Sequence, residues 1–535
     1  MPARTARGTR GAVASPHHLA SQAGLGVLRA GGSAVDAAIA TNAALAVVAA
    51  HSCGLGGDAF WLIWDGTEVH ALNGSGASAA GATIEAAAAA GLTEMPFRGP
   101  WTVTVPGAIH SWGEAHDRFG RLPWRALLEP AIELADGFAA SAEWCRIIER
   151  AAELFGTDSD WAHTFRPDGR PWRPGERVTL PRLADTLRRL RDEGPTEAYE
   201  GTLAERAAEY LESRGSPLRL ADFLDQRSEW TEPLSIGYRG LVSVSHPPNS
   251  SGPTALALLG LLERFAPPAA DAFASGHADA RWVHLGLEAA RLAVAEREAE
   301  LADPHYMADG ALERMLDAGH LDELAATIDA DRAQPTARPA DDGDTIFLTT
   351  ADGDGNAVSL IESNYNGFGS GLVDPETGVS YQNRGRSFRF AAGHPNVLAP
   401  HKRPAHTLTP GMLLRDGRLW IAHGSMGGEI QPLVFAQLVS AIVDGGLDIA
   451  TAVAAPRWIR GVPDGSSPAD TALLESRFAN DVVEGLRGRG HEVRLIDAFS
   501  SLVGHEQAIE LVEVDGARTL AGASDPRSDG AAVAW

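Results

Sequence analysis

Residues 343–352, GDTIFLTTAD, mark an abrupt boundary in this chain of 535 residues. They end a loop rich in Pro, Asp and Gly that begins near residue 329, and they start a strand of alternating character at Thr345. The strand turns at residues 352–356, DGDGN, and returns over residues 357–363, AVSLIES, which predicts a β-hairpin with a glycine-bearing loop. Thr345 is therefore expected at the start of a central strand.

A threonine at such a boundary can act as a nucleophile if the chain is cut before it. The hydroxyl is weakly nucleophilic at neutral pH, but an N-terminal threonine carries its own base, an α-amino group that titrates near about pH 8. In the uncut chain the same hydroxyl can attack the preceding carbonyl, and hydrolysis of the resulting ester exposes the amine. The hypothesis is cleavage between Asp344 and Thr345; the alternative on spacing alone is an ordinary β-branched strand residue.

The overall composition indicates a large, loop-rich globular protein. The chain has 44% hydrophobic residues, 58 Gly and 32 Pro, and its length predicts two closely packed lobes or one large α/β unit. A net charge of −25 argues against nucleic acid or an anionic membrane as a partner. The only cysteines, Cys53 and Cys145, are expected to be buried and inert. Because the N-terminus also lacks the apolar segment of a secretory signal, the sequence predicts a cytoplasmic protein.

Hydrophobic periodicity predicts further helices and strands. The predicted elements are two helices over 15–50 separated by Gly31-Gly32, a strand pair over 58–73, a helix over 203–213 and a long helix over 279–301. A capping box of Thr202 with Glu205 and an N-cap at Asp279 are expected to begin the last two helices. The apolar run 34–50 is too short and too often interrupted for a membrane span, so a buried helix is expected.

Several tempting motifs do not support a cofactor or a metal. The glycines of residues 54–57 lack a preceding strand and the dinucleotide register, so close backbone packing or an active-site wall is favoured. Residues 352–363 lack the glycine and the glutamate of a calcium loop. Ser425 is not expected to be a nucleophile, because His423 replaces the first glycine of a hydrolase elbow. No histidine or cysteine spacing predicts a metal site.

A set of motifs in a fixed order makes the chain resemble the γ-glutamyltransferase family of N-terminal nucleophile hydrolases over nearly its whole length. These motifs are GGSAVDAA (31–38), HSCGLGGDAF (51–60), VPG (105–107), DT (344–345), DGDGNAVS (352–359), FGSG (368–371), KRP (402–404), GSMGG (424–428) and GASDPRS (522–528). The resemblance implies an α+β fold, a four-layer αββα sandwich. It also implies two processed chains, 1–344 and 345–535, that associate as one folded unit.

The resemblance further implies roles for individual residues. Ser363 matches the family's second hydroxyl near the nucleophile, and its alternative is a strand serine bonded to backbone. Gly427 and Gly428 match the paired glycines whose N–H groups hold the oxyanion, a role that suits glycine because the donors must approach the reacting carbon closely. A simple tight turn is the alternative, and both descriptions can hold.

This chain departs from the family pattern where an amino-acid substrate is recognised. Residues 73–76, NGSG, place Ser75 where transpeptidases carry an arginine for the glutamyl α-carboxylate. The acidic pair for the α-ammonium falls on Arg386-Ser387, and the Ser-Ser pair falls on His406-Thr407. Losing a bidentate arginine removes charge-assisted bonds of roughly 1.5 to 3 kcal/mol each. The residues at these positions, with Arg384, are the predicted substrate-binding residues.

We therefore expect an amidohydrolase or acyltransferase that cleaves an amide of a small carboxylate-bearing acyl group, oxamate-like or glutaryl-like, through an acyl-enzyme. The pattern QNRG at 382–385 resembles the oxamate amidohydrolase branch of the family. The alternatives are hydrolysis of γ-glutamyl compounds such as glutathione, and an unprocessed binding protein without catalysis. Arg384 and Arg386 could instead pair with acidic side chains. No cofactor is expected, and a homodimer is possible.

Overall fold

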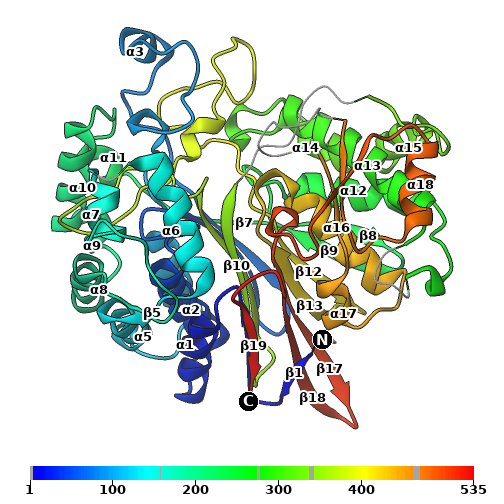
Figure 1. Cartoon of the computed structure of the whole chain (residues 1–535), viewed down its shortest axis with the longest axis horizontal. Helices are drawn as coiled ribbons and strands as arrows, with labels where there is room; N and C mark the ends of the chain where they lie inside the picture. Colours follow the sequence, from blue (N-terminus) through cyan, green and yellow to red (C-terminus); the bar gives the residue numbers. More distant parts are fainter. Residues whose placement is uncertain (1–3, 157, 274–277, 336–342, 462–469) are drawn as a thin grey trace.

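Two seven-stranded antiparallel sheets form the centre of the computed structural model, which describes residues 4–156, 158–273, 278–335, 343–461 and 470–535 (Figure 1). The first sheet has the order β19 (Ala531–Ala534), β2 (Gly11–Ser15), β10 (Asp344–Asp352), β11 (Ala357–Tyr365), β3 (Asp58–Trp64), β4 (Val69–Gly74) and β7 (Glu229–Thr231). The second has the order β1 (Ala6–Gly8), β18 (Ala517–Ser524), β17 (Glu506–Val514), β13 (Arg418–Ser425), β12 (Pro410–Arg415), β9 (Leu241–Ser245) and β8 (Leu234–Tyr238). The predicted hairpin, β10 and β11, occupies the middle of the first sheet.

The two sheets pack face to face, and helices cover both outer faces. Leu62 of the first sheet and Met412 of the second belong to one buried cluster between the sheets. The first sheet is covered by α1 (His18–Arg29), α2 (Ala34–Val48), α4 (Ala108–Phe119), α5 (Trp124–Asp136) and α8 (Pro181–Glu193). The second is covered by α12 (Gly252–Glu263), α13 (Ala280–Glu300) and α16 (Gln431–Val443). The predicted four-layer αββα sandwich is confirmed.

Shorter elements surround this sandwich. Beside the first helical layer lie α3 (Ile84–Ala89), α6 (Ala142–Phe155), α7 (Asp160–Phe165), α9 (Glu197–Glu200), α10 (Thr202–Ser213), α11 (Leu220–Leu224) and the pair β5 (Phe138–Ala139) and β6 (Arg177–Val178). Beside the second lie α14 (Ala311–Leu316), α15 (Ala318–Ala326), α17 (Ile449–Ala454), α18 (Asn480–Gly488) and the small sheet of β14 (Trp458–Arg460), β15 (Ala472–Glu475) and β16 (Val493–Ile496).

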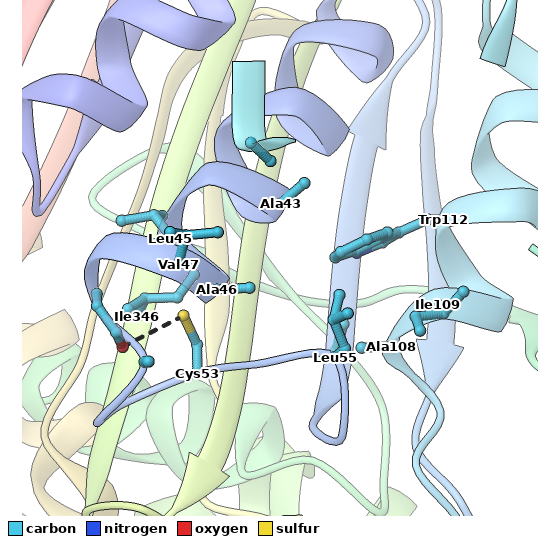
Figure 2. Packing of buried hydrophobic residues seen from close by; sticks show 14 of the residues in the cluster. Ala43, Leu45, Ala46, Val47, Cys53, Leu55, Ala108, Ile109, Trp112 and Ile346 are labelled. Atoms are coloured by element: carbon cyan, nitrogen blue, oxygen red, sulfur yellow. Dashed lines mark hydrogen bonds between the residues drawn. The ribbon is translucent and has the colours of Figure 1, made fainter. Parts of the chain in front are cut away.

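Helix α2 packs against the hairpin, which is why its alanine-rich sequence is buried along its whole length (Figure 2). Its small side chains share a cluster with Ile346 of β10. Asn42 of the same helix accepts a hydrogen bond from Trp112 Nε1 at 2.8 Å and donates one to Glu362 Oε2 at 2.9 Å. Just beyond the helix, Cys53 Sγ donates to the carbonyl of Ala49 at 3.7 Å. These contacts hold β11 at a fixed position.

Most of the predicted elements are confirmed, and two local predictions are wrong. Thr202 does not cap a helix: it is the first residue of α10, and its hydroxyl accepts a hydrogen bond from Arg189 at 2.9 Å. Cys145 is only partly buried, whereas Cys53 is buried as expected. Asp279 caps α13 by accepting from the N–H of Trp282 at 2.8 Å. No helix in the described part of the chain is long and apolar enough to cross a membrane.

Candidate active site

Thr345 lies at the start of β10, where the ladder with β11 changes register between residues 344 and 346. It is only 2% exposed, and its Oγ1 lies 3.0 Å from Ser363 Oγ. Ser363 Oγ donates to the carbonyl oxygen of Asp344 at 2.8 Å and accepts from the N–H of Tyr365 at 2.7 Å. A serine hydroxyl has one proton to donate, so the Thr345 hydroxyl is the donor to Ser363. The structure brings both predicted hydroxyls to the peptide bond expected to be cut.

The glycine pair Gly427-Gly428 follows β13 and faces the same peptide bond. Gly427 has φ +135° and Gly428 has φ +60°, backbone conformations that favour glycine. A Cβ on Gly343 would lie 2.9 Å from the Cα of Gly428, so the segment before Thr345 touches this loop. Neither N–H group of the pair donates to an acceptor among the described residues. Two close N–H donors without partners suit an oxyanion.

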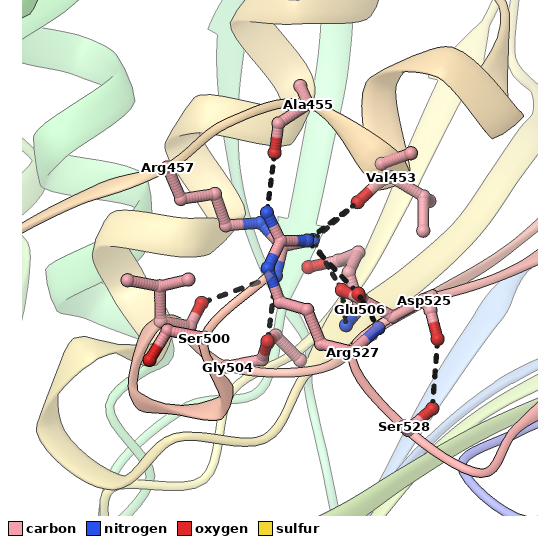
Figure 3. A network of polar contacts seen from close by, with 12 residues as sticks. Val453, Ala455, Arg457, Ser500, Gly504, Glu506, Asp525, Arg527 and Ser528 are labelled. Carbon is pink, nitrogen blue, oxygen red and sulfur yellow. Dashed lines mark hydrogen bonds and ion pairs between the residues drawn. The ribbon is translucent and has the colours of Figure 1, made fainter. Parts of the chain in front are cut away.

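A buried network of charges supports the loop beside this glycine pair (Figure 3). Arg457 pairs with Asp525 at 2.7 Å and donates to the carbonyl of Gly504 at 2.8 Å. Arg527 pairs with the same carboxylate at 3.0 Å. Burial alone raises the pKa of Asp525, but the two guanidinium groups lower it to about 2. A Cβ on Gly504 would lie 2.5 Å from the carbonyl oxygen of Met426, so this network directly supports the glycine loop.

A second polar cluster lies on the neighbouring strand, where Asp58 pairs in register with Ser363. Asp58 Oδ1 accepts from the N–H groups of Gly107 at 3.0 Å and Gly76 at 3.2 Å. Asp58 Oδ2 lies 3.4 Å from His406 Nε2. Burial raises the pKa of Asp58 to about 7 and lowers the pKa of His406 well below its usual range. His406 is therefore a neutral residue behind the nucleophile.

The hydroxyl of the predicted substrate residue Ser75 bonds to neutral side chains, whereas its carbonyl accepts a hydrogen bond from Arg403 Nε at 3.1 Å. Its Oγ donates to Asn73 Oδ1 at 2.7 Å and accepts from Asn249 Nδ2 at 3.2 Å. It does not line either of the two cavities described below. Ser75 therefore helps to fix the end of β4.

Arg384 and Thr407 are in contact, and both are buried. Arg384 Nη1 donates to Thr407 Oγ1 at 3.1 Å, and the guanidinium lies 4.0 Å from the centre of the Tyr365 ring. Its Nε and Nη2 atoms have no hydrogen-bond partner among the described residues. Burial lowers the pKa of Arg384 to about 10. A wholly buried cation whose N–H groups are not all hydrogen-bonded can bind an anion. Arg384 is buried in this way, but it lines neither the small cavity beside Arg386 nor the large cavity beside Thr345.

Arg386 and Tyr365 both line a small cavity of about 40 Å³. Its guanidinium stacks on the ring of Phe97 at 4.2 Å and lies 5.9 Å from that of Tyr365. Two further arginines line the cavity: Arg297 pairs with Glu298 at 3.0 Å, and Arg389 pairs with the same glutamate at 2.6 Å. Of the five predicted substrate residues, Arg386 thus lines a cavity, whereas Ser75, Arg384, His406 and Thr407 are buried.

A larger cavity of about 580 Å³ opens directly on Thr345 and contains charged residues for which no function was predicted from the sequence. Arg146 of α6 donates to Glu143 Oε2 at 2.9 Å. His51 and His505 also line the cavity, and burial lowers the pKa of each to about 4, so both are neutral at pH 7. His51 is the first residue of the HSCGLGGDAF motif (51–60). Glu143, Arg146 and His505 belong to no motif found in the sequence, so no local pattern pointed to them.

The expectation that the chain has no metal site stays a prediction. Among the described residues, His284, Glu288 and His491 lie close enough to share an ion. However, Glu288 already pairs with Arg291 at 2.9 Å and lies 3.5 Å from Arg460. Because these arginines balance the charge of Glu288, the carboxylate is less suited to binding a metal. Its contact with Arg460 instead links α13 to β14.

An αββα sandwich whose central hairpin begins with a threonine, facing a paired-glycine loop, defines the class of N-terminal nucleophile hydrolases. The family model described as Gamma-glutamyltranspeptidase matches residues 20–535. The chain belongs to this family, as the sequence motifs predicted. It is accordingly an enzyme of the N-terminal nucleophile hydrolase class.

Individual relatives are similar over almost the whole chain. The Glutathione hydrolase-like YwrD proenzyme of Bacillus subtilis is 38% identical over 530 residues, covering 98% of each chain. The Oxamate amidohydrolase proenzyme of Klebsiella pneumoniae is 39% identical over 537 residues, covering 98% of this chain and 99% of its own. The crystal structure of cephalosporin acylase from Bacillus halodurans superposes with a TM-score of 0.92 at 36% identity, covering 100% and 98%.

Proposed function

We propose that the chain cuts itself between Asp344 and Thr345, giving the chains 1–344 and 345–535. The contact of Thr345 Oγ1 with Ser363 Oγ, which in turn donates to the Asp344 carbonyl, supports this assignment. The hydroxyl oxygen adds to the carbonyl carbon, the C–N bond breaks, and an ester forms while the proton moves to the released amine. Water then hydrolyses the ester, leaving a carboxylate on Asp344 and a free α-amino group on Thr345.

The matured site is proposed to use the same atoms for turnover. Thr345 Oγ attacks a substrate amide, and the α-amino group of Thr345 takes the hydroxyl proton and passes it to the leaving amine. The N–H groups of Gly427 and Gly428 hold the oxyanion. Water, or an acceptor amine, then removes the acyl group from the threonine.

The proposed substrate is an amide of a small acyl group that bears a carboxylate but no α-ammonium group. Arg386 beside Tyr365 supplies a cation at a cavity adjoining the glycine loop, while Ser75 and the neutral His406 supply no charge for an amino acid. The Oxamate amidohydrolase name of one relative agrees with such an acyl group. The second candidate is a γ-glutamyl substrate, which the Glutathione hydrolase-like relative favours.

The first test is the intact mass and N-terminal sequence of the purified protein and of its Thr345→Ala variant. We expect two fragments that sum to the precursor plus one water, with the second beginning at Thr345, and an uncut variant. A single uncut chain in both samples would contradict the proposal and favour an unprocessed binding protein.

The acyl group is tested with oxamate, glutaryl anilide and γ-glutamyl anilide. Arg386→Gln is expected to lower kcat/KM for the preferred carboxylate-bearing acyl donor by about tenfold or more, through loss of a charge-assisted contact. Arg418→Gln is the matched control, since Arg418 is exposed and pairs only loosely with Glu513 at 3.4 Å. Equal activity of the Arg386 variant and this control would rule out the role of Arg386.

A further inference from the structure

Several segments line the large cavity beside Thr345. Helix α6 contributes much of the lining, including Glu143, Ile147, Arg150 and Leu154, which recur at helical spacing. Leu502 and residues of the glycine loop also line the cavity. Figure 1 shows α6 beside the central strands, on the side of the first helical layer. A space of about 580 Å³ is comparable to a small-molecule binding site.

Three large apolar side chains are exposed at this cavity, which the exposed charged residues Arg146, Arg150 and Glu153 also line. Phe97 is 50% exposed, Leu154 is 60% exposed and Leu502 is 40% exposed, and these side chains come from three separate segments. All three line the same cavity. Exposing large apolar side chains to water is unfavourable, and their convergence around one opening marks a site that binds apolar groups.

An arginine organises the aromatic part of the rim. The guanidinium of Arg98 lies 5.2 Å from the centre of the Phe97 ring and 5.0 Å from that of Phe155. Arg98 Nη1 also donates to the carbonyl of Gly369. These contacts hold a charged plane and two rings at the cavity, a surface on which an aromatic group can stack.

Different residues of the glycine loop line the two cavities. Met426 and Gly427 line the large cavity, whereas Glu429 and Tyr365 line the small one. An amide whose carbonyl oxygen lies at the N–H groups of Gly427 and Gly428 can therefore place one substituent in each cavity. Under the proposed function the acyl group lies on the side of Arg386, so the amine lies in the large cavity.

We infer that the amine released by this enzyme is bulky and apolar, an arylamine or a branched alkylamine, and that it binds in the large cavity against Leu154, Leu502 and Phe97. This inference rests on the proposed function. When the C–N bond breaks, the amine nitrogen takes the proton held by the α-amino group of Thr345. The amine then leaves through the apolar opening, and water enters to cleave the acyl ester. A primary amide, which releases ammonia, leaves this surface unused.

Turnover tests the inference with pairs of amides that share one acyl group and differ only in the amine, aniline or ammonia. Wild type is expected to favour the anilide, and Leu154→Glu to lower the ratio of kcat/KM for anilide over primary amide by about tenfold. Leu224→Glu is the matched control, because Leu224 is a 41% exposed helical leucine that does not line the cavity. A ratio unchanged by Leu154→Glu, or a wild-type preference for the primary amide, would overturn the inference.

Binding to the uncut protein tests the same site without turnover. A failure of the proposed catalytic function can therefore be told apart from the absence of an amine-binding site. We expect 2-naphthylamine to bind saturably to the Thr345→Ala variant by calorimetry and to quench Trp144, which lines the cavity. Adding Leu154→Glu is expected to weaken binding by about fivefold to tenfold, and adding Leu224→Glu to leave it unchanged. No saturable binding, or equal weakening by both substitutions, would refute an apolar amine site.

Discussion

At the residue scale, three oxygen atoms define the chemistry of the site: Thr345 Oγ1, Ser363 Oγ and the carbonyl oxygen of Asp344. Thr345 donates its hydroxyl proton to Ser363, and Ser363 donates to the carbonyl that precedes Thr345. The serine therefore polarises the carbonyl of the bond proposed to be cut. It also holds the threonine hydroxyl close to that carbonyl.

Replacing Ser363 by Ala is expected to slow self-cleavage by about 10²-fold to 10³-fold, the usual effect of removing a donor to a developing oxyanion. The measurement is a time course of fragment appearance by mass spectrometry. Ser359→Ala is the control, because Ser359 lies on the same strand and is equally buried, but bonds to the carbonyl of His423 at 3.1 Å. Equal rates of fragment appearance in the two variants would show that Ser363 has no role in self-cleavage.

A buried carboxyl behind the nucleophile makes stability depend on pH. In the folded protein burial raises the pKa of Asp58 from 3.8 to about 7, so the folded state keeps a proton that the unfolded state loses. Wild type is therefore expected to lose stability relative to Asp58→Asn as pH rises from about 4 to about 7, with the full difference present above pH 7. Denaturant midpoints of the two proteins across this range check the expectation; a difference independent of pH contradicts it.

At the element scale, the hairpin β10–β11 places the nucleophile and the loop after β13 places the oxyanion donors. The change of register at residues 344–346 disturbs the strand pairing where the proposed cut lies, as β-bulges do beside active sites. The buried ion pairs of Arg457, Asp525 and Arg527 support this loop through Gly504, which packs against the carbonyl of Met426. The GASDPRS motif thus has a structural role next to the site.

Breaking this network is expected to destabilise the fold strongly. Asp525→Asn removes the carboxylate that pairs with the buried Arg457, whereas Arg527 keeps its pair with Glu475 at 2.6 Å. Because the Arg457 charge is left without its partner in the interior, we expect the free energy of unfolding to fall by about 3–5 kcal/mol. Glu513→Gln removes an exposed ion pair with Arg418 and is expected to cost less than about 1 kcal/mol. Urea unfolding in the Thr345→Ala background measures both. Similar losses in the two variants would show that the network contributes little.

At the scale of the whole molecule, the two proposed chains are interleaved in both sheets. In the first sheet β10 and β11, from the second chain, lie between β2 and β3 of the first chain. In the second sheet β12 of the second chain pairs with β9 of the first, and β18 pairs with β1. Separating the chains would break strand ladders in both sheets and expose the core between them.

The cut protein is therefore expected to behave as one particle. Size-exclusion chromatography of the matured protein should give a single peak containing both fragments in equal amounts, and they should separate only in denaturant. Native mass spectrometry also reports whether the particle is a monomer or a homodimer. Dissociation of the fragments without denaturant would contradict the interleaved topology.

The sequence by itself determined the hairpin at Thr345 and the family, because strand alternation, glycine positions and motif order are local properties of the chain. The sandwich followed from the resemblance to that family, as did the roles predicted for Ser363 and the glycine pair, which the structure places beside Thr345 and the segment before it. Only the tertiary structure decided that Arg384 lies buried behind Tyr365 while Arg386 faces a cavity. It alone gathered Phe97, Leu154 and Leu502 around one opening. The physical reason is that cavities and ion pairs depend on contacts between segments far apart in the chain, which no local pattern encodes.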